Sequence, residues 1–180
     1  MKRNFGLTAI VAVAATFAAS AQTLAAGALD LVPADSTVVV RFKNPESTIT
    51  KVAGFANQVQ PGIGFLIQGQ AQALGVIISN PTMGGVDLKD DWYISVKVNK
   101  GDLPHVTFHV PATNVDAMTE SIGEDFSFAM KGKWVAYSEA EEATQAVKQC
   151  IAGKRKSIST VMDRRSTELF NGNEISAFIN

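Results

Sequence analysis

The sequence predicts an α+β domain, a largely antiparallel sheet with helices packed on one face. Two segments, 92–110 and 126–138, alternate apolar and polar residues as β-hairpins do. Each is followed by apolar residues at helical spacing, so a hairpin-helix unit is repeated over 92–122 and 126–152. Cleanly alternating strands are typical of antiparallel sheets with one covered and one solvated face.

Length and composition limit the class of protein. A chain of 180 residues is long enough for one domain, and 46% hydrophobic with 18% charged residues is typical of a globular core. The formal net charge is −1 and the sequence pI is about 6.1. These values argue against a disordered chain and against a basic nucleic-acid-binding protein, so we expect no nucleic-acid partner.

The first residues have the three parts of a signal peptide. Lys2 and Arg3 precede an apolar run over 5–19, and Ala19-Ser20-Ala21 is a small-x-small cleavage pattern. We therefore expect a signal peptide over 1–21, with cleavage as late as residue 26 at a second small-residue site, and a domain over 27–180. The alternative is a membrane anchor, but the Ala-rich run is short for a span of about 20 strongly apolar residues.

No later segment is long and apolar enough to cross a membrane, so we expect no transmembrane helix once the signal peptide is removed. The protein is then exported, either to the periplasm or out of the cell. Its one cysteine, Cys150, excludes an internal disulfide. Cys150 shares a helical stripe with apolar residues, which favours a small core residue over a reactive thiol.

The first strand and helix follow from local signals. Residues Thr37–Phe42 alternate as a strand does. Asn44, Pro45 and Glu46 then supply an N-cap, a first-turn proline and a first-turn acid. The helix has an apolar stripe formed by Ile49, Val52, Phe55, Ala56 and Val59, and Pro61-Gly62 ends it.

Residues 63–78 are apolar and interrupted by glycines, which predicts a helix over about 62–75 and an irregular segment after it. A buried helix is the favoured interpretation. The alternative is a groove or membrane-surface segment that binds an apolar ligand or lipid. The pair Gly84-Gly85 is a turn, because it lacks the Lys-Ser/Thr of a phosphate-binding loop.

The hairpin over 92–110 allows one register in which both faces are coherent. Ile94 then lies opposite Phe108 on the apolar face. The polar side chains share the other face, which we expect to be wet. That face supplies the candidate binding residues, which are Arg41, Tyr93, Lys97, His105 and His109, with Ser95 and Thr107 between them.

The later elements have their own start and stop signals. A helix opens at Thr113 and closes at Gly123, and a second hairpin covers 126–138. Ser138 and Glu141 form a capping box for a helix that runs to about residue 152. A last helix is expected over about 158–170, followed by a terminal strand over 174–179.

No pattern of residues predicts catalysis. His105 and His109 lie four strand residues apart, about 13 Å, too far for one metal ion with bonds of about 2 Å. We expect no metal, no cofactor and no catalytic residue. The acidic cluster at 139–142 and the basic cluster at 153–156 are explained by the two ends of one helix, and no GxSxG-type motif presents a nucleophile.

Three stretches resemble a known group of proteins: "LVPADSTVVVRFKNP", "NPTMGGVDL" followed by "DWYISV", and "KGKWVAYS". They are similar to exported bacterial proteins of unknown function whose mature part opens with a Leu-x-Pro-Ala-Asp-Ser/Thr motif that leads into a strand. Members of that group are longer and repeat the βα unit. The resemblance implies that this chain holds the first repeat and the opening strand of the next, and it implies no activity.

The terminal segment "GNEISAFIN" echoes "DSTVVVRFKN", since Phe precedes a final Asn by two places in both. We expect the terminal strand to pair with the domain's own sheet and to leave its far edge free for a strand of a second copy or of another envelope protein. The favoured function is a non-enzymatic exported module that binds a protein partner or builds part of the cell envelope. The alternative is an apolar-ligand or lipid binder that uses residues 63–78, and an enzyme of unknown type comes third.

Overall fold

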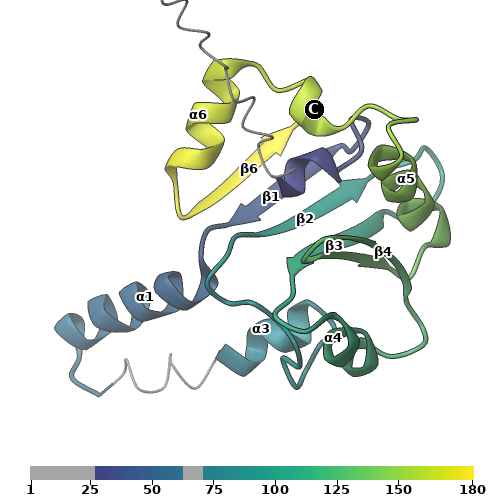
Figure 1. The fold of residues 1–180 in the computed structure, drawn as a ribbon. Coiled ribbons are helices and arrows are strands. Elements are labelled where there is room, and N and C mark those ends of the chain that lie inside the picture. Colours follow the sequence, from purple (N-terminus) through teal and green to yellow (C-terminus); the bar gives the residue numbers. More distant parts are fainter. Residues whose placement is uncertain (1–26, 63–70) are drawn as a thin grey trace, which may run out of the picture.

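The computed structural model describes residues 27–62 and 71–180, and in them one six-stranded sheet lies among several helices (Figure 1). The strand order is β4-β5-β3-β2-β1-β6, and every neighbouring pair is antiparallel. The strands are β1 (Val38–Phe42), β2 (Trp92–Lys97), β3 (His105–Pro111), β4 (Ser127–Lys131), β5 (Trp134–Ser138) and β6 (Ile175–Ile179). The predicted α+β class is confirmed.

The helices interleave with these strands along the chain. They are η1 (Ala28–Asp30), α1 (Pro45–Val59), α3 (Ala71–Ile77), α4 (Val115–Ile122), α5 (Glu141–Ile151), η2 (Ile158–Thr160) and α6 (Arg164–Gly172). Of the helix expected over about 62–75, residues 63–70 lie outside the described residues, and α3 covers the last part of the expected range and extends to Ile77. In the described part of the chain no helix is long and apolar enough to cross a membrane.

The β2–β3 hairpin has the register expected from the sequence. Ile94 lies opposite Phe108, Tyr93 opposite His109, and Lys97 opposite His105. The register is fixed because a slip of one residue would move the apolar side chains of one strand to the opposite face from those of its partner.

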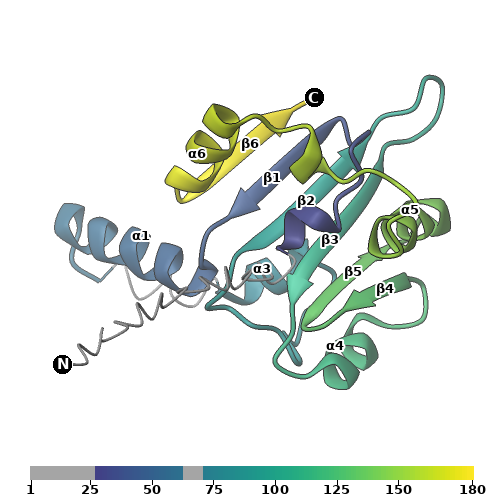
Figure 2. The same ribbon diagram turned by 45° about the horizontal axis from the view of Figure 1, so that its top comes forward.

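Helices cover both faces of the sheet, and not one face as the sequence predicted. One face of the sheet carries the side chain of Trp92 and is called the Trp92 face. On it, Val110 and Tyr137 pack with Ile78 beside α3 and with Met118 of α4. The opposite face carries Tyr93 and is called the Tyr93 face. One cluster there joins the sheet to η1, η2 and α6, and its buried members include Val32, Val39, Ile158 and Phe170. A second cluster joins the sheet to α5 and includes Ala136 and Val147. Figure 2 shows η1, α5 and α6 on one side of the sheet and α3 on the other.

The expected wet face is wrong for most of its residues. Arg41, Tyr93 and His109 are only 5%, 7% and 0% exposed, and Ser95 and Thr107 are also buried. The reason is that η1, η2, α5 and α6 lie over this polar face, where its side chains find partners inside the protein. Lys97 and His105 lie near its margin and are half-buried.

The two hairpin-helix units are alike in chain order only. The helix of the first unit, α4, packs through Met118 and Ile122 on the Trp92 face. The helix of the second unit, α5, packs through Val147 against Ala129 and Ala136 on the Tyr93 face. Cys150 of α5 is buried, as its helical spacing predicted. Because the helices lie on opposite faces, the units are not copies of one structural repeat.

Helix α1 begins as expected and then leaves most of its apolar stripe uncovered. Asn44 caps it, since its Oδ1 accepts a hydrogen bond from the Ser47 backbone N–H at 2.9 Å. Within the helix only Pro45 and Ala53 are buried, whereas Val52, Phe55 and Val59 are 50%, 69% and 73% exposed. Figure 1 shows α1 extending away from the sheet.

The C-terminal part folds back onto the sheet. The single helix expected over 158–170 is divided into η2 and α6, because Asp163 caps α6 by accepting a hydrogen bond from the Ser166 N–H at 2.6 Å. β6 then pairs with β1, with Ala177 opposite Val40, so the expected docking of the terminal strand is confirmed. The sequence similarity between residues 35–44 and 172–180 is not matched in the structure, because Phe42 and Phe178 point to opposite faces of the sheet.

Candidate functional site

Arg41 joins β1 to the end of α6. Its Nε and Nη2 donate to Oδ2 of Asp91 at 2.9 and 2.6 Å, and its Nη1 donates to the carbonyls of Phe170 and Asn173 at 3.1 and 3.3 Å. A buried guanidinium with four such contacts is a structural tie, because its donors are engaged within the protein. Arg41 therefore does not belong to an accessible site.

Tyr93 and His109 are cross-strand neighbours beneath the covering helices. The Tyr93 ring stacks on Phe170, with centroids 6.3 Å apart, and burial raises its pKa. His109 Nε2 lies 2.9 Å from Ser95 Oγ, and burial lowers the pKa of His109 to about 3. Among the described residues its Nδ1 has no hydrogen-bond partner, so this Ser–His pair lacks the orienting carboxylate of a catalytic triad.

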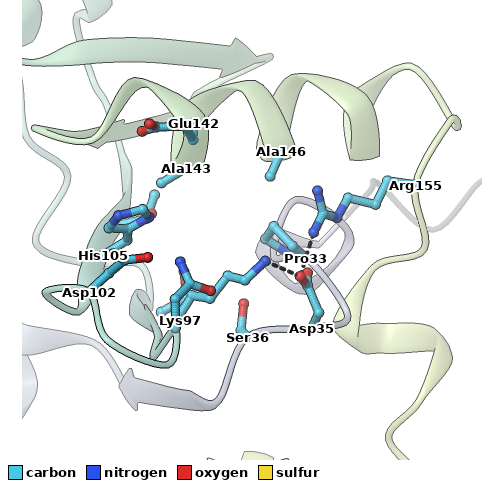
Figure 3. A pocket seen from close by; sticks show the side chains of 13 residues that line it. Pro33, Asp35, Ser36, Lys97, Asp102, His105, Glu142, Ala143, Ala146 and Arg155 are labelled. Carbon is cyan, nitrogen blue, oxygen red and sulfur yellow. Dashed lines mark hydrogen bonds and ion pairs between the residues drawn. The ribbon is translucent and has the colours of Figure 1, made fainter.

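Lys97 and His105 reach a polar cavity of about 290 Å³ at the margin of the Tyr93 face. Figure 3 shows Lys97 and Arg155 converging on Asp35, with His105, Asp102 and Glu142 toward the other side of the cavity. Lys97 Nζ and Arg155 Nη2 each donate to Asp35 Oδ2 at 2.5 Å. Of the five predicted residues, this cavity thus brings together two, and Arg41, Tyr93 and His109 do not line it.

Asp35 pairs with both Lys97 and Arg155, and Asp102 and Glu142 also line the cavity, so three acidic side chains balance the two cations and the cavity is not an anion site. Partial burial is the largest single influence on the pKa of Asp35 and raises it, but the hydrogen bonds and charges of Arg155 and Lys97 together lower it to about 2. The carboxylate stays ionised, so it is no proton donor near neutral pH. In residues 27–62 and 71–180 no three His, Cys, Asp or Glu side chains gather as metal ligands would.

Sequence reasoning did not select Asp35 or Arg155 for this cavity. Asp35 belongs to the motif that carries the family resemblance, and Arg155 belongs to the basic cluster after α5. They lie 120 positions apart in the chain, and no local pattern joins them.

A second, apolar cavity opens on the Trp92 face. Its volume is about 150 Å³. It lies among the start of α1, the end of α3 and the ends of the four neighbouring strands β3, β2, β1 and β6. Its lining includes Phe42, Ile49, Leu74, Ile77, Trp92 and Ile175. Leu74 and Ile77 belong to the segment 63–78 that was a candidate for apolar binding, and residues 63–70 of that segment lie outside the described residues.

The outer edge of β6 is the third candidate. The N–H of Lys43 donates to the carbonyl of Glu174 at 2.7 Å, and the N–H of Asn180 donates to the carbonyl of Thr37 at 3.0 Å. In an antiparallel ladder, every second residue directs its backbone N–H and C=O groups to the same neighbouring strand, so those of Ser176 and Phe178 also face β1. Those of Ile175, Ala177 and Ile179 face away from it, and no described strand lies beyond them.

This edge has few of the features that protect exposed strands. β6 contains no proline and no charged residue, and its ladder with β1 runs without a bulge. Ile175 and Ile179 are 56% and 76% exposed. A groove of about 380 Å³ runs between α6 and β6, lined in part by Leu169 and Phe178. The strand at the opposite end of the sheet, β4, by contrast ends in Lys131.

Comparison of the chain with protein-family models, with curated proteins and with solved structures found no match. The resemblance to exported bacterial proteins therefore stays a prediction.

Proposed function

We propose that the protein is a non-enzymatic binding module of the cell envelope, exported to the periplasm or out of the cell, which holds a protein partner by strand addition at the edge of β6. The observation that carries the proposal is the row of outward-facing backbone groups at Ile175, Ala177 and Ile179. An extended segment laid along such an edge gains main-chain hydrogen bonds, and adjoining pockets select its side chains.

The surroundings of the edge support a peptide strand in particular. The groove beside α6 offers Leu169, which is 62% exposed, to side chains on the Tyr93 face of an added strand. Ile175 and Ile179 offer apolar contact on the Trp92 face. Exposed apolar side chains on both faces of an open ladder favour a partner strand that is apolar on both of its faces.

Binding of an apolar ligand is the second candidate, and the largely apolar lining of the Trp92-face cavity favours it. The volume decides against a large ligand. About 150 Å³ is the size of a cavity that holds one benzene-sized ring, whereas drug-sized ligands occupy about 300–1,000 Å³. A lipid chain does not fit within the described lining, so the protein partner is the better-supported proposal.

An enzyme is the least supported alternative. His109 is buried and has no carboxylate partner among the described residues, and both cations at Asp35 are already paired. These groups have structural explanations, so none of them favours a reaction.

Photo-crosslinking in the producing cell tests the proposed function. A photoreactive amino acid at Ile175 should give an adduct with the bound protein, and the same amino acid at the exposed loop residue Leu103 should not. The added change Ala177→Pro, which removes an outward N–H, should abolish the adduct from Ile175. The proposal fails if Ile175 gives no adduct, or if the adduct survives Ala177→Pro.

A further inference from the structure

The backbone of β6 is complementary to itself. If a second β6 lies antiparallel to the first with Ala177 at the centre, Ile175 of one copy lies opposite Ile179 of the other, and Ala177 lies opposite Ala177. These are the residues whose N–H and C=O groups face away from β1. Each hydrogen-bonded pair in an antiparallel ladder exchanges two bonds, so three such pairs form about six.

The side chains are complementary in the same register. On the Trp92 face, Ile175 would contact Ile179 of the second copy, and these residues are 56% and 76% exposed in the single chain. β-Branched pairs directly opposite each other stabilise antiparallel strands. On the Tyr93 face, Ser176 would lie opposite Phe178, so a small side chain meets a large one.

Charge also permits this pairing. Between residues 174 and 180 the one charged side chain is Glu174, and in this register it lies opposite Asn180 of the second copy. Like side-chain charges therefore do not meet in the ladder. Glu174 is moreover paired with Lys51 of α1 at 2.6 Å.

The exposed stripe of α1 supplies further apolar area near this edge. Lys51 of α1 forms an ion pair with Glu174. Ile49 of α1 and Ile175 of β6 line the same apolar cavity. A stable interface buries about 800 Å² on each partner, more than a five-residue ladder offers alone. Val52 and Phe55, which are 50% and 69% exposed, lie on the helix that begins beside the edge.

We propose that the partner of β6 is β6 of a second copy of this chain, so that two sheets join across a two-fold axis at Ala177. This inference rests on the proposed function, because it names the partner for the same edge. A two-fold axis requires a self-complementary surface, and the backbone pattern, the side chains and the charges of β6 meet that requirement in one register.

Charge reversal on the axis tests the dimer. The side chain of Ala177 is exposed, so Ala177→Lys and Ala177→Glu should fold, which circular dichroism checks. In each homodimer two like charges would lie opposite each other, and we expect the dissociation constant to rise about a hundredfold. Mixing the two variants should restore the dimer, because the charges are then opposite. Leu103→Lys is the control for added charge.

Sedimentation of the protein purified from cells that express the full sequence gives the outcomes. A wild-type dimer, two monomeric Ala177 variants and a restored mixed dimer would support the inference. A wild-type monomer, unchanged variants, or a mixture that stays monomeric would each overturn it. If the wild type is a monomer and Ile175 still crosslinks to a different protein, the dimer is wrong and the proposed function stands; if neither occurs, both fail.

Discussion

A matched pair of proline substitutions tests the orientation of β6. Proline removes one backbone N–H, so its effect depends on where that N–H points. The N–H of Ser176 faces β1 and that of Ala177 faces away, by the alternation that begins at the bond from Lys43 to Glu174. Ser176→Pro therefore breaks the ladder, whereas Ala177→Pro leaves it intact.

The magnitudes follow from the bonds. Ser176→Pro removes one ladder bond and leaves the carbonyl of Arg41 without its partner, which costs about 3 kcal/mol in the free energy of unfolding. The Ser176 hydroxyl has no hydrogen-bond partner among the described residues, so its loss adds little. Ala177→Pro should cost about 1 kcal/mol or less, the adjustment of one edge residue.

Urea unfolding of both variants measures the difference. It is done at a concentration where the wild type is monomeric, so that assembly does not contribute. We expect Ser176→Pro to be less stable than Ala177→Pro by about 2 kcal/mol. Equal losses, or a larger loss for Ala177→Pro, would refute the assignment of outward and inward backbone groups.

Three further predictions concern the covered face and the N-terminus. Arg41→Met keeps the apolar stem but removes the ion pair of Asp91 and the donor to two carbonyls, so it should cost about 3 kcal/mol in urea unfolding. Arg164→Met at an exposed ion pair should cost about 0.5 kcal/mol or less, and similar losses for the two variants would contradict the structural role of Arg41. Burial lowers the pKa of His109 from 6.5 to about 3, so the unfolded chain takes up a proton that the folded chain excludes. The free energy of unfolding should therefore fall as the pH drops from about 6.5 to about 3. His109→Gln should lose this part of the pH dependence, and an unchanged slope would argue against a buried neutral imidazole. Mass spectrometry of the exported protein should find a new N-terminus between Gln22 and Gly27, and an intact Met1 would contradict the signal peptide.

Local sequence patterns predicted the elements whose signals lie within a few residues. The β2–β3 register is an example, since the pairing of Ile94 with Phe108 places all the apolar side chains of the hairpin on one face. The cap of α1 at Asn44 is another. The break before α6 was not predicted, although Asp163, which stands three residues before Ser166, was a local signal for the capping bond.

The candidate site was harder to predict because burial is decided by distant segments. Polar residues of the Tyr93 face suggest contact with water, yet Arg41 finds its partners at Asp91, Phe170 and Asn173. Similarly, Lys97 meets Asp35, 62 positions away. Neither alternation nor helical spacing states which face a later helix will cover, so α4 and α5 on opposite faces could not be foreseen.

Residue-resolved amide exchange across β6 tests the central claim most directly. It is measured in dilute solution and at a concentration where sedimentation detects assembly. We expect Ser176 and Phe178 to be protected in both, and Ile175, Ala177 and Ile179 to exchange fast when dilute and slowly when assembled. Assembly without a change at these three amides would contradict strand addition at the edge of β6.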